Sequence, residues 1–441
     1  MGALPLAATG VLEHPGKGRL SLERRLLRVW LAGMFALLPM DLAVLPLNVD
    51  LADCWILLGL PCLWLSLLRG QRIIALSYAI PMWMIVVASV ASTFAAIEPL
   101  LSIVVLAKEV FLFALFLTMA ALFHALDAQD LRFVLTVWLV AAVLHGCLIV
   151  AQFLAPGVWR ATSALAGRST AHVHYRPSGL FGNANKAAVH QLFGYVPLLL
   201  WGPSRKATMV LGVALLPTIM ATGSMAAAIA FLAGLMVALA ATFACGRLVP
   251  VVKTLVRLAL IVMLIGGLLF VAFGTSDRAR AHLERILFGR TDRSSESRFS
   301  LWQRGLSAYV DHSAYLWGLG PENFRAVDGA GNQLHNDLLA FSVERGLLGT
   351  VGLVLFAGLA LSRAALVVRA YRTHPEHGQL AYVVFLAAMV ATIVESLTHQ
   401  MFHIHERWLV LALQEATLLK MASVEGESRD PSAGWAAAPL S

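Results

Sequence analysis

The chain has 441 residues, of which 59% are hydrophobic and only 13% are charged, and its mean hydropathy is +0.77. Because this polar content is too small to cover the surface of a soluble globular protein, we predict an integral membrane protein. The apolar runs are continuous and do not alternate, which excludes a membrane-spanning β-barrel. The formal net charge of +8 is scattered over loops without a basic patch interleaved with aromatic residues, which excludes nucleic acid as a partner and favours membrane topology and an anionic ligand.

Apolar runs of roughly 20 residues, the length that crosses a bilayer, recur along the chain. They predict an all-α polytopic membrane protein with about twelve transmembrane helices. The predicted spans are residues 29–47, 51–68, 73–96, 99–123, 131–154, 187–203, 206–222, 224–245, 254–274, 346–366, 379–398 and 406–422.

The positions of arginine and lysine predict the orientation of these spans. One set of short loops contains basic residues such as Arg69, Arg72 and Arg132, whereas the short loops near Asn48, Ala96 and Gly223 contain none. Because basic short loops stay in the cytoplasm, we expect both termini on the cytoplasmic side and both long loops on the outer face.

This orientation predicts five parts of the chain. They are a cytoplasmic N-terminus (1–28), spans one to nine (29–274) with a first outer loop at 155–186, a large helical outer loop (275–345), spans ten to twelve (346–422) and a disordered cytoplasmic tail (423–441).

The segment 298–349 is the longest water-compatible stretch, and its pattern predicts two helices around a glycine-rich turn at residues 318–321. An apolar stripe is expected on the first helix, at Phe299, Trp302, Leu306, Tyr309 and Val310. The second helix is expected to begin near His335, with Asn336 as its cap. A histidine at the positive end of a helix should stay neutral, which is the state that a general base needs.

Several motifs resemble the signature of the O-antigen ligase and polymerase family. They are RFSLWQRG (298–305), GLGPENF (318–324) and HNDLLAFSVERGLLG (335–349), together with YRPSGLFGNANKAA (175–188), which is similar to the first outer-loop motif of the family. The order and combination of these motifs carry the resemblance, since each piece alone is a weak signal.

The resemblance implies an inverting, metal-independent membrane glycosyltransferase of the GT-C type that needs no cofactor. It would lie in the bacterial inner membrane with its active site facing the periplasm, and it would take a glycan from undecaprenyl diphosphate. In a ligase the acceptor is lipid A-core, and in an O-antigen or exopolysaccharide polymerase it is another lipid-linked repeat unit. Membrane lipid surrounds the enzyme in either case.

Cleavage of a sugar diphosphate bond develops negative charge that cations must stabilise. The outer loops contain no Asp-x-Asp pair to hold a metal, so arginine forks are the natural substitute. Arg298 and Arg176 are the first candidates for diphosphate binding, with Lys186 and Arg304 behind them; a solvated or salt-bridged surface role is the alternative for each. The family often has a Ser-Arg pair after span seven, and this chain has Ser224-Met225 there, which gives Arg176 more weight.

His335 is the predicted general base for the acceptor hydroxyl. Asp337 and Glu344 could orient its ring or bind sugar hydroxyls, although capping explains Asp337 equally well. Asn183 and Asn185 could bind sugar or diphosphate oxygens, or could serve only the turn. Trp302 and Asn336 complete the predicted substrate-binding set.

Two other groups of polar residues lie near or within predicted spans. His399, His403 and His405 have spacing at which a metal is conceivable, but we predict no metal site, because no cysteine or carboxylate pair completes a shell; an interfacial role near the acceptor is favoured. Lys108 and Glu109 lie deep in a predicted span, so each should have a partner on another helix or line a cavity for the lipid carrier.

Two other classes of function remain as alternatives. A transporter or lipid-linked glycan flippase would fit about twelve spans with buried charges, but the two halves of the chain show no internal symmetry. A passive membrane scaffold would leave the His-Asn and Arg-x-x-x-Trp patterns unexplained.

Overall fold

The structure is a computed structural model of the chain. It describes residues 22–40, 43–45, 49–69, 77–165, 176–201, 205–244, 291–329, 331–373 and 381–428. Within these ranges the chain is helical except for loops and one short antiparallel strand pair, β1 (Ala43–Leu45) and β2 (Val49–Asp50). The predicted all-α class is therefore confirmed.

The helices follow the predicted spans in order along the chain. The first half contains α1 (Leu22–Leu37), α2 (Leu51–Arg69), α3 (Ala79–Thr93), α4 (Pro99–Ala125), α5 (Ala128–Leu154), α6 (Pro156–Leu165), α7 (Ala184–Phe193) and α8 (Tyr195–Trp201). The second contains α9 (Arg205–Ala221), α10 (Met225–Ala244), α13 (Thr291–Asp311), α14 (Phe324–Asp328), α15 (Asp337–Thr373), α16 (Ala381–Ser396) and α17 (His405–Ser428).

Four of the described helices, α4, α5, α10 and α15, are long and apolar enough to cross a membrane. Shorter apolar stretches occur in α2, α3, α9 and α16. The chain is thus a helical membrane protein, while the number of about twelve spans stays a prediction. The predicted span 254–274 lies outside the described residues.

The predicted spans 29–47 and 187–203 are wrong. The first predicted span, 29–47, ends as a helix at Leu37, because Pro39 cannot continue the helix and restricts the residue before it; residues 43–45 form β1 instead. The first outer loop contains α6, which begins at Pro156 in the position where proline suits a helix start. The span 187–203 is divided at Gly194 into α7 and α8.

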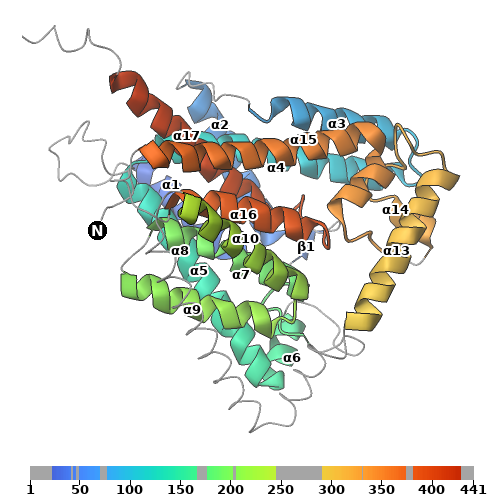
Figure 1. Ribbon diagram of the computed structural model, residues 1–441, viewed down its shortest axis with the longest axis horizontal. Helices are drawn as coiled ribbons and strands as arrows, with labels where there is room; N and C mark the ends of the chain where they lie inside the picture. Colours follow the sequence, from blue (N-terminus) through green and yellow to red (C-terminus); the bar gives the residue numbers. More distant parts are fainter. Residues whose placement is uncertain are drawn as a thin grey trace, which may run out of the picture.

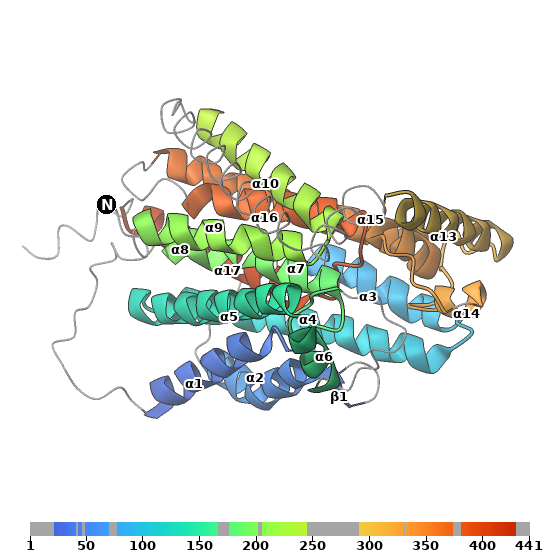
Figure 2. The same cartoon turned by 90° about the horizontal axis from the view of Figure 1, so that it is seen from below.

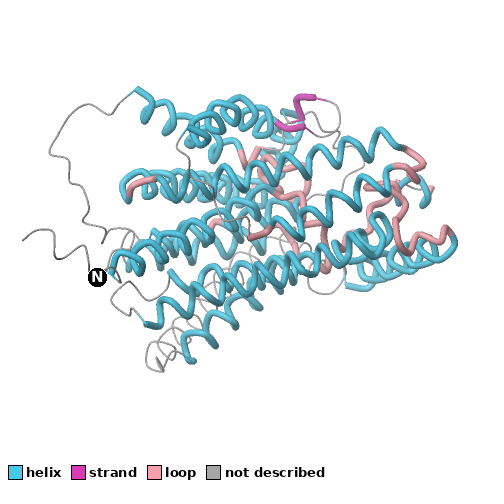
Figure 3. Tube along the Cα trace, turned by 90° about the horizontal axis from the view of Figure 1, so that it is seen from above, coloured by secondary structure: helices cyan, strands magenta, loops and turns pink. Residues whose placement is uncertain are grey.

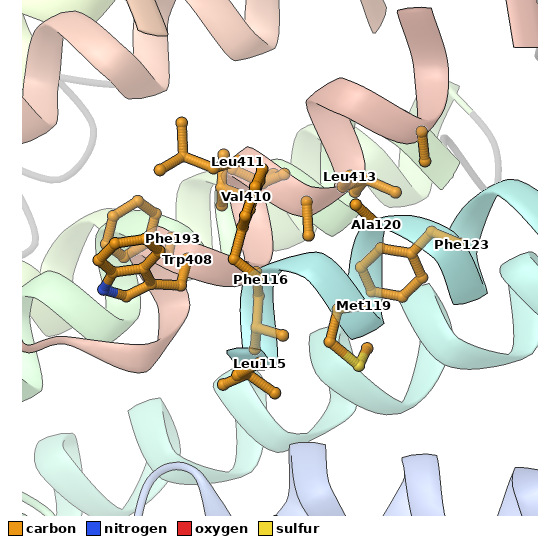
Figure 4. Packing of buried hydrophobic residues seen from close by; sticks show 14 of the residues in the cluster. Leu115, Phe116, Met119, Ala120, Phe123, Phe193, Trp408, Val410, Leu411 and Leu413 are labelled. Carbon is orange, nitrogen blue, oxygen red and sulfur yellow. The ribbon is translucent and has the colours of Figure 1, made fainter. Parts of the chain in front are cut away.

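Helix α17 lies in the middle of the bundle. It packs along α4, while α15 packs along α3 and α10 along α16 (Figures 1 and 2). Figure 4 shows Trp408, Leu411 and Leu413 of α17 meeting Phe116 and Met119 of α4 in the hydrophobic core. Every residue from His405 to Thr417 is buried, so the charges of α17 need partners from the helices around it.

The two ends of the bundle are different. Helices α13 and α14 lie together at one end, toward which most of the described loops gather (Figures 2 and 3). At the other end, Arg28 of α1 donates a hydrogen bond to Asp130 of α5 (2.6 Å), and Lys420 of α17 donates one to the Leu126 carbonyl (2.8 Å). The start of α1 and the last turns of α17 therefore lie at the same end, opposite α13.

A break in α15 attaches α13 and the turn after it to the bundle. Gly346 has a left-handed φ of 64°, which interrupts the helix and leaves main-chain groups without helical partners. The Leu347 amide donates to the Tyr315 carbonyl (2.8 Å), and the Gly320 amide donates to the Glu344 carbonyl (2.9 Å). We call residues 298–336, which this seam joins to α15, the cap.

Replacement of Gly346 by alanine should destabilise the protein. A Cβ there would lie 2.3 Å from the Leu316 carbonyl oxygen, and a left-handed φ in a residue other than glycine costs about 1–3 kcal/mol by itself. We expect a clearly lower midpoint of thermal unfolding in detergent. Gly358→Ala is the matched control, because the added Cβ in the same helix meets nothing within 4 Å and should be neutral or slightly stabilising. Equal losses in both variants would contradict the strain argument.

Candidate functional site

The cap packs on the start of α15 through small residues. Gly305 lies so close to Leu334 that a Cβ would come within 2.5 Å of its side chain, and Leu301 and Ala308 are buried on the same face. The predicted apolar stripe is therefore partly wrong. Phe299, Leu306 and Val310 lie on the exposed face of α13, because the close approach requires small side chains and leaves the bulky ones outside.

Trp302 positions the loop that carries His335. Its indole Nε1 donates a hydrogen bond to the Leu334 carbonyl (3.1 Å), the group just before His335. Arg298 lies one turn earlier on α13, so the same bond brings Arg298 toward His335. The Arg-x-x-x-Trp spacing thus has a geometric reason: tryptophan fixes the loop and arginine faces the residue that the loop presents.

His335 precedes α15 in a constrained conformation. Its φ of 49° lies in the left-handed region, which costs energy for residues other than glycine, and residues with such strain cluster at functional sites. Asn336 holds this conformation from both sides. Its Oδ1 accepts a hydrogen bond from the Leu339 amide (3.0 Å), which confirms the predicted cap, and its Nδ2 donates one to the Leu397 carbonyl after α16 (3.0 Å).

His399 brings Arg298 and His335 together. Arg298 Nη2 lies 3.3 Å from His399 Nε2, and the rings of His335 and His399 meet edge to face with centroids 6.2 Å apart. On the other side of the ring, His399 Nδ1 lies 2.7 Å from Oε1 of the buried Glu395. We call these four residues the imidazole cluster.

Burial and neighbouring charge keep His335 neutral. Burial lowers its pKa to about 4, and His399 and Arg298 act in the same direction. Burial also lowers the pKa of Arg298, and the nearby Glu395 opposes that shift; the guanidinium remains charged at neutral pH. The cluster therefore offers a fixed cation and an unprotonated imidazole side by side.

The two carboxylates predicted to orient His335 contact other residues. Both oxygens of Asp337 accept the Met401 amide (3.1 Å each), and Arg407 lies 3.6 Å away. Glu344 is buried beneath the cap turn, 3.3 Å from Arg345. Among the described residues, these two carboxylates therefore join the cap and α15 to the bundle. The residue whose ring contacts His335 is His399.

Arg176 lies at the turn between α9 and α10. Its guanidinium donates hydrogen bonds to the carbonyls of Thr222 (3.2 and 3.3 Å) and Gly223 (3.3 Å) and to Asn185 Oδ1 (3.1 Å). A cation is favourable there because it lies at the negative end of α9. Asn183 accepts the Asn185 amide (2.8 Å) and caps α7, so turn chemistry explains it, and Lys186 is exposed on the first turn of α7.

The two arginine regions lie toward the same end of the bundle without a described contact between Arg176 and Arg298. Helices α10 and α16 run antiparallel and pack closely at Gly234 and Ala387, so the turn that Arg176 binds is near the end of α16, which leads to His399 (Figure 2). The roles predicted for Arg176, Arg298 and His335 in one reaction require that the three residues lie near one another. In the structure, Arg298 and His335 both contact the ring of His399, whereas Arg176 binds the neighbouring turn between α9 and α10.

Arg304 has the salt-bridged surface role predicted as the alternative to diphosphate binding. It pairs with Asp328 at the end of α14 (2.7 Å) and is half exposed, as expected of a surface ion pair within the cap.

The three histidines after α16 diverge instead of forming one site. His399 lies beside Glu395, His403 Nε2 is 3.4 Å from Glu109, and His405 Nε2 is 2.7 Å from Asp53. Within the described ranges no group of three histidine, cysteine or acidic residues could hold a metal ion. Glu109 also pairs with Arg345 of α15, as predicted for a buried charge with a partner on another helix.

An apolar groove on the described surface lies elsewhere. It has a volume of about 590 Å³ and is lined by apolar residues of α3 and by Trp317, beyond the end of α13 that is far from Arg298. The imidazole cluster is therefore a separate, polar site.

The comparison with protein families agrees with the motifs. The model of the O-antigen ligase family matches residues 208–354, about a third of the chain, from within α9 through the cap into α15. The resemblance predicted from the motifs is confirmed over this segment, which contains Arg298, Trp302 and His335. No curated protein matches the chain.

The His335 ring should titrate near pH 4 instead of near its ordinary value of 6.5. Because the folded pKa lies below the unfolded one, this residue contributes stability above pH 6.5 that is lost as the pH falls toward 4. NMR of ¹³C-histidine in micelles, with the signal assigned by its loss in His335→Gln, measures this pKa. A midpoint between 6 and 7 would contradict the environment described for the ring.

Proposed function

We propose that the protein is an O-antigen ligase that transfers a glycan from undecaprenyl diphosphate to a lipid A-core acceptor. The imidazole cluster carries the proposal, because it holds a cation suited to diphosphate beside a neutral base suited to a hydroxyl. The family match over the same segment supports it. We further infer that the cap faces the periplasm and that both termini are cytoplasmic, as the loop charges predict.

The proposed reaction is a single inverting displacement. The acceptor oxygen attacks the anomeric carbon of the donor and forms the new glycosidic bond, while the bond from that carbon to the diphosphate oxygen breaks and its electron pair stays on the diphosphate. The proton of the acceptor hydroxyl passes to His335. This step needs a base at the acceptor oxygen and a cation at the diphosphate oxygens.

Arginine is the proposed means of stabilising the leaving group without a metal. The fork of Arg298 can bind two phosphate oxygens at once and remains charged throughout. Arg176 is the proposed second cation, because its guanidinium reaches the Thr222–Gly223 turn, beside which the family often has an arginine and this chain has Met225. Arg176 would therefore supply, at the same place in space, the positive charge that an arginine at position 225 often supplies in members of the family.

The remaining candidates have supporting roles in this proposal. Trp302 and Asn336 fix the loop on which His335 lies, and Asn185 orients Arg176. Asp337 and Glu344 hold the base of the cap. Lys186 and Asn183 are near enough to Asn185 in sequence to line the donor site, but the capping bond of Asn183 suffices to explain that residue.

Purified protein should release undecaprenyl diphosphate and form a new glycoside when given the lipid-linked glycan and lipid A-core. EDTA should leave the rate unchanged, since arginine replaces the metal. A product that forms only with a second lipid-linked unit as acceptor would identify a polymerase. Movement of the lipid-linked glycan between leaflets without a new glycoside would identify a flippase and reject the transferase.

Substitutions should separate the base from the cation. His335→Ala removes the base and should lower kcat by about 10²–10⁴-fold with normal expression. Arg298→Lys keeps the charge but loses the fork, and loss of one charge-assisted hydrogen bond corresponds to a fall of about 10–100-fold in kcat/KM. Arg369→Lys, an exposed arginine at the far end of α15, is the matched control. Near-normal turnover of His335→Ala would reject its assignment as the base.

A further inference from the structure

A buried carboxylate lies behind the cation of the proposed site. Glu395 is in the last turn of α16 and its side chain is fully buried, while His399 follows one turn later with its Nδ1 2.7 Å from Glu395 Oε1. A buried carboxylate without a compensating charge or donor is costly, so the close approach of the His399 ring is favourable. In the sequence, the signal for this pair is the four-residue spacing of Glu395 and His399.

The contacts of His399 define its proton position. A guanidinium has only donors, so Nε2 of His399 must accept the hydrogen bond from Arg298 (3.3 Å). The proton of the neutral ring is then on Nδ1, which lies 2.7 Å from Glu395 Oε1 and 3.3 Å from Thr398 Oγ1. The two acceptors beside Nδ1 thus favour the tautomer and the ring orientation in which His399 can hold Arg298.

The same ring also contacts His335. Its centroid is 6.2 Å from that of His335, with the planes at 70° to each other. His399 therefore determines how far Arg298 lies from the proposed base, although it belongs to a segment about a hundred residues later in the chain.

We propose that the Glu395–His399 pair is a positioning device that holds Arg298 in place for the diphosphate of the donor and releases it when the donor binds. This inference rests on the proposed function. His399 is a positioning residue here, because it acts on the substrate through Arg298. Before the donor arrives, the pair keeps the guanidinium at the imidazole cluster. The phosphate oxygens, which are charged acceptors, then replace His399 Nε2 as the partner of Arg298.

The exchange has a physical advantage for the reaction. An arginine that is already ordered loses less conformational entropy when it binds the diphosphate. Once the fork of Arg298 is bound to phosphate, its positive charge is compensated, and the ring of His335 no longer faces a bare cation. The base then accepts a proton more readily in the donor complex than in the empty site.

The test compares variants of His399 in full-length protein with undecaprenyl-diphosphate-linked glycan as donor. His399→Ala should raise the donor KM by about tenfold, with a smaller effect on kcat, because Arg298 must be ordered during binding. His399→Gln should recover most of the affinity, since its amide can accept from Arg298 and donate to Glu395. His312→Ala, an exposed histidine in the cap, is the matched control.

A double-mutant cycle shows whether the effect passes through Arg298. If it does, Arg298→Ala with His399→Ala should be no worse than Arg298→Ala alone, in donor KM and in the Kd for undecaprenyl diphosphate. Additive losses, or equal defects in His399→Ala and His399→Gln, would overturn the positioning role while leaving the transferase intact. A wild-type protein that forms no glycoside from any lipid-diphosphate donor would instead reject the proposed function itself.

Discussion

The segment from Glu395 to Arg407, which joins the end of α16 to the start of α17, connects the helices of the bundle through buried polar contacts. The rest of the structure depends on it. Its residues engage a different helix at almost every step. His399, beside Glu395, contacts Arg298 of α13. The Met401 amide and Arg407 contact Asp337 of α15. Three further contacts reach other helices: His403 to Glu109 of α4, His405 to Asp53 of α2, and Glu406 to His190 of α7. Because buried charges need partners, this segment cannot shift without leaving several of them unpaired. The imidazole cluster is therefore preorganised, as an electrostatic site must be.

Local sequence patterns predicted the parts of the site that local structure determines. The four-residue spacing places Arg298 and Trp302 on one side of α13, and the His-Asn pair marks the start of α15 with Asn336 as its cap. The partner that joins Arg298 to His335 could not be predicted in this way. His399 lies 101 residues from Arg298, and no periodicity records contacts over such a separation.

The positions of the helices could likewise be predicted from local sequence, whereas the faces on which they pack could not. Apolar runs located the helices, and Pro39 and Gly194 were breaks that run length alone passed over. The buried face of α13 was mistaken because hydrophobic periodicity gives weight to bulky residues, whereas close helix packing selects small ones such as Gly305. Helix α17 shows the converse: a helix can occupy the centre of a bundle when buried charges such as Glu406 and Arg407 meet partners on other helices.

The seam between the cap and α15 is made of main-chain groups, which every residue type supplies alike. The amides and carbonyls of Tyr315, Leu319, Val343 and Leu347 can keep their hydrogen bonds when most of their side chains are exchanged. Homologous chains could therefore differ widely in the exposed residues around this turn and still attach the cap in the same place. The strict requirement falls on the positions with left-handed φ, Gly318, Gly320 and Gly346, so glycine spacing would be a better guide than hydrophobicity for recognising the same joint in a distant sequence.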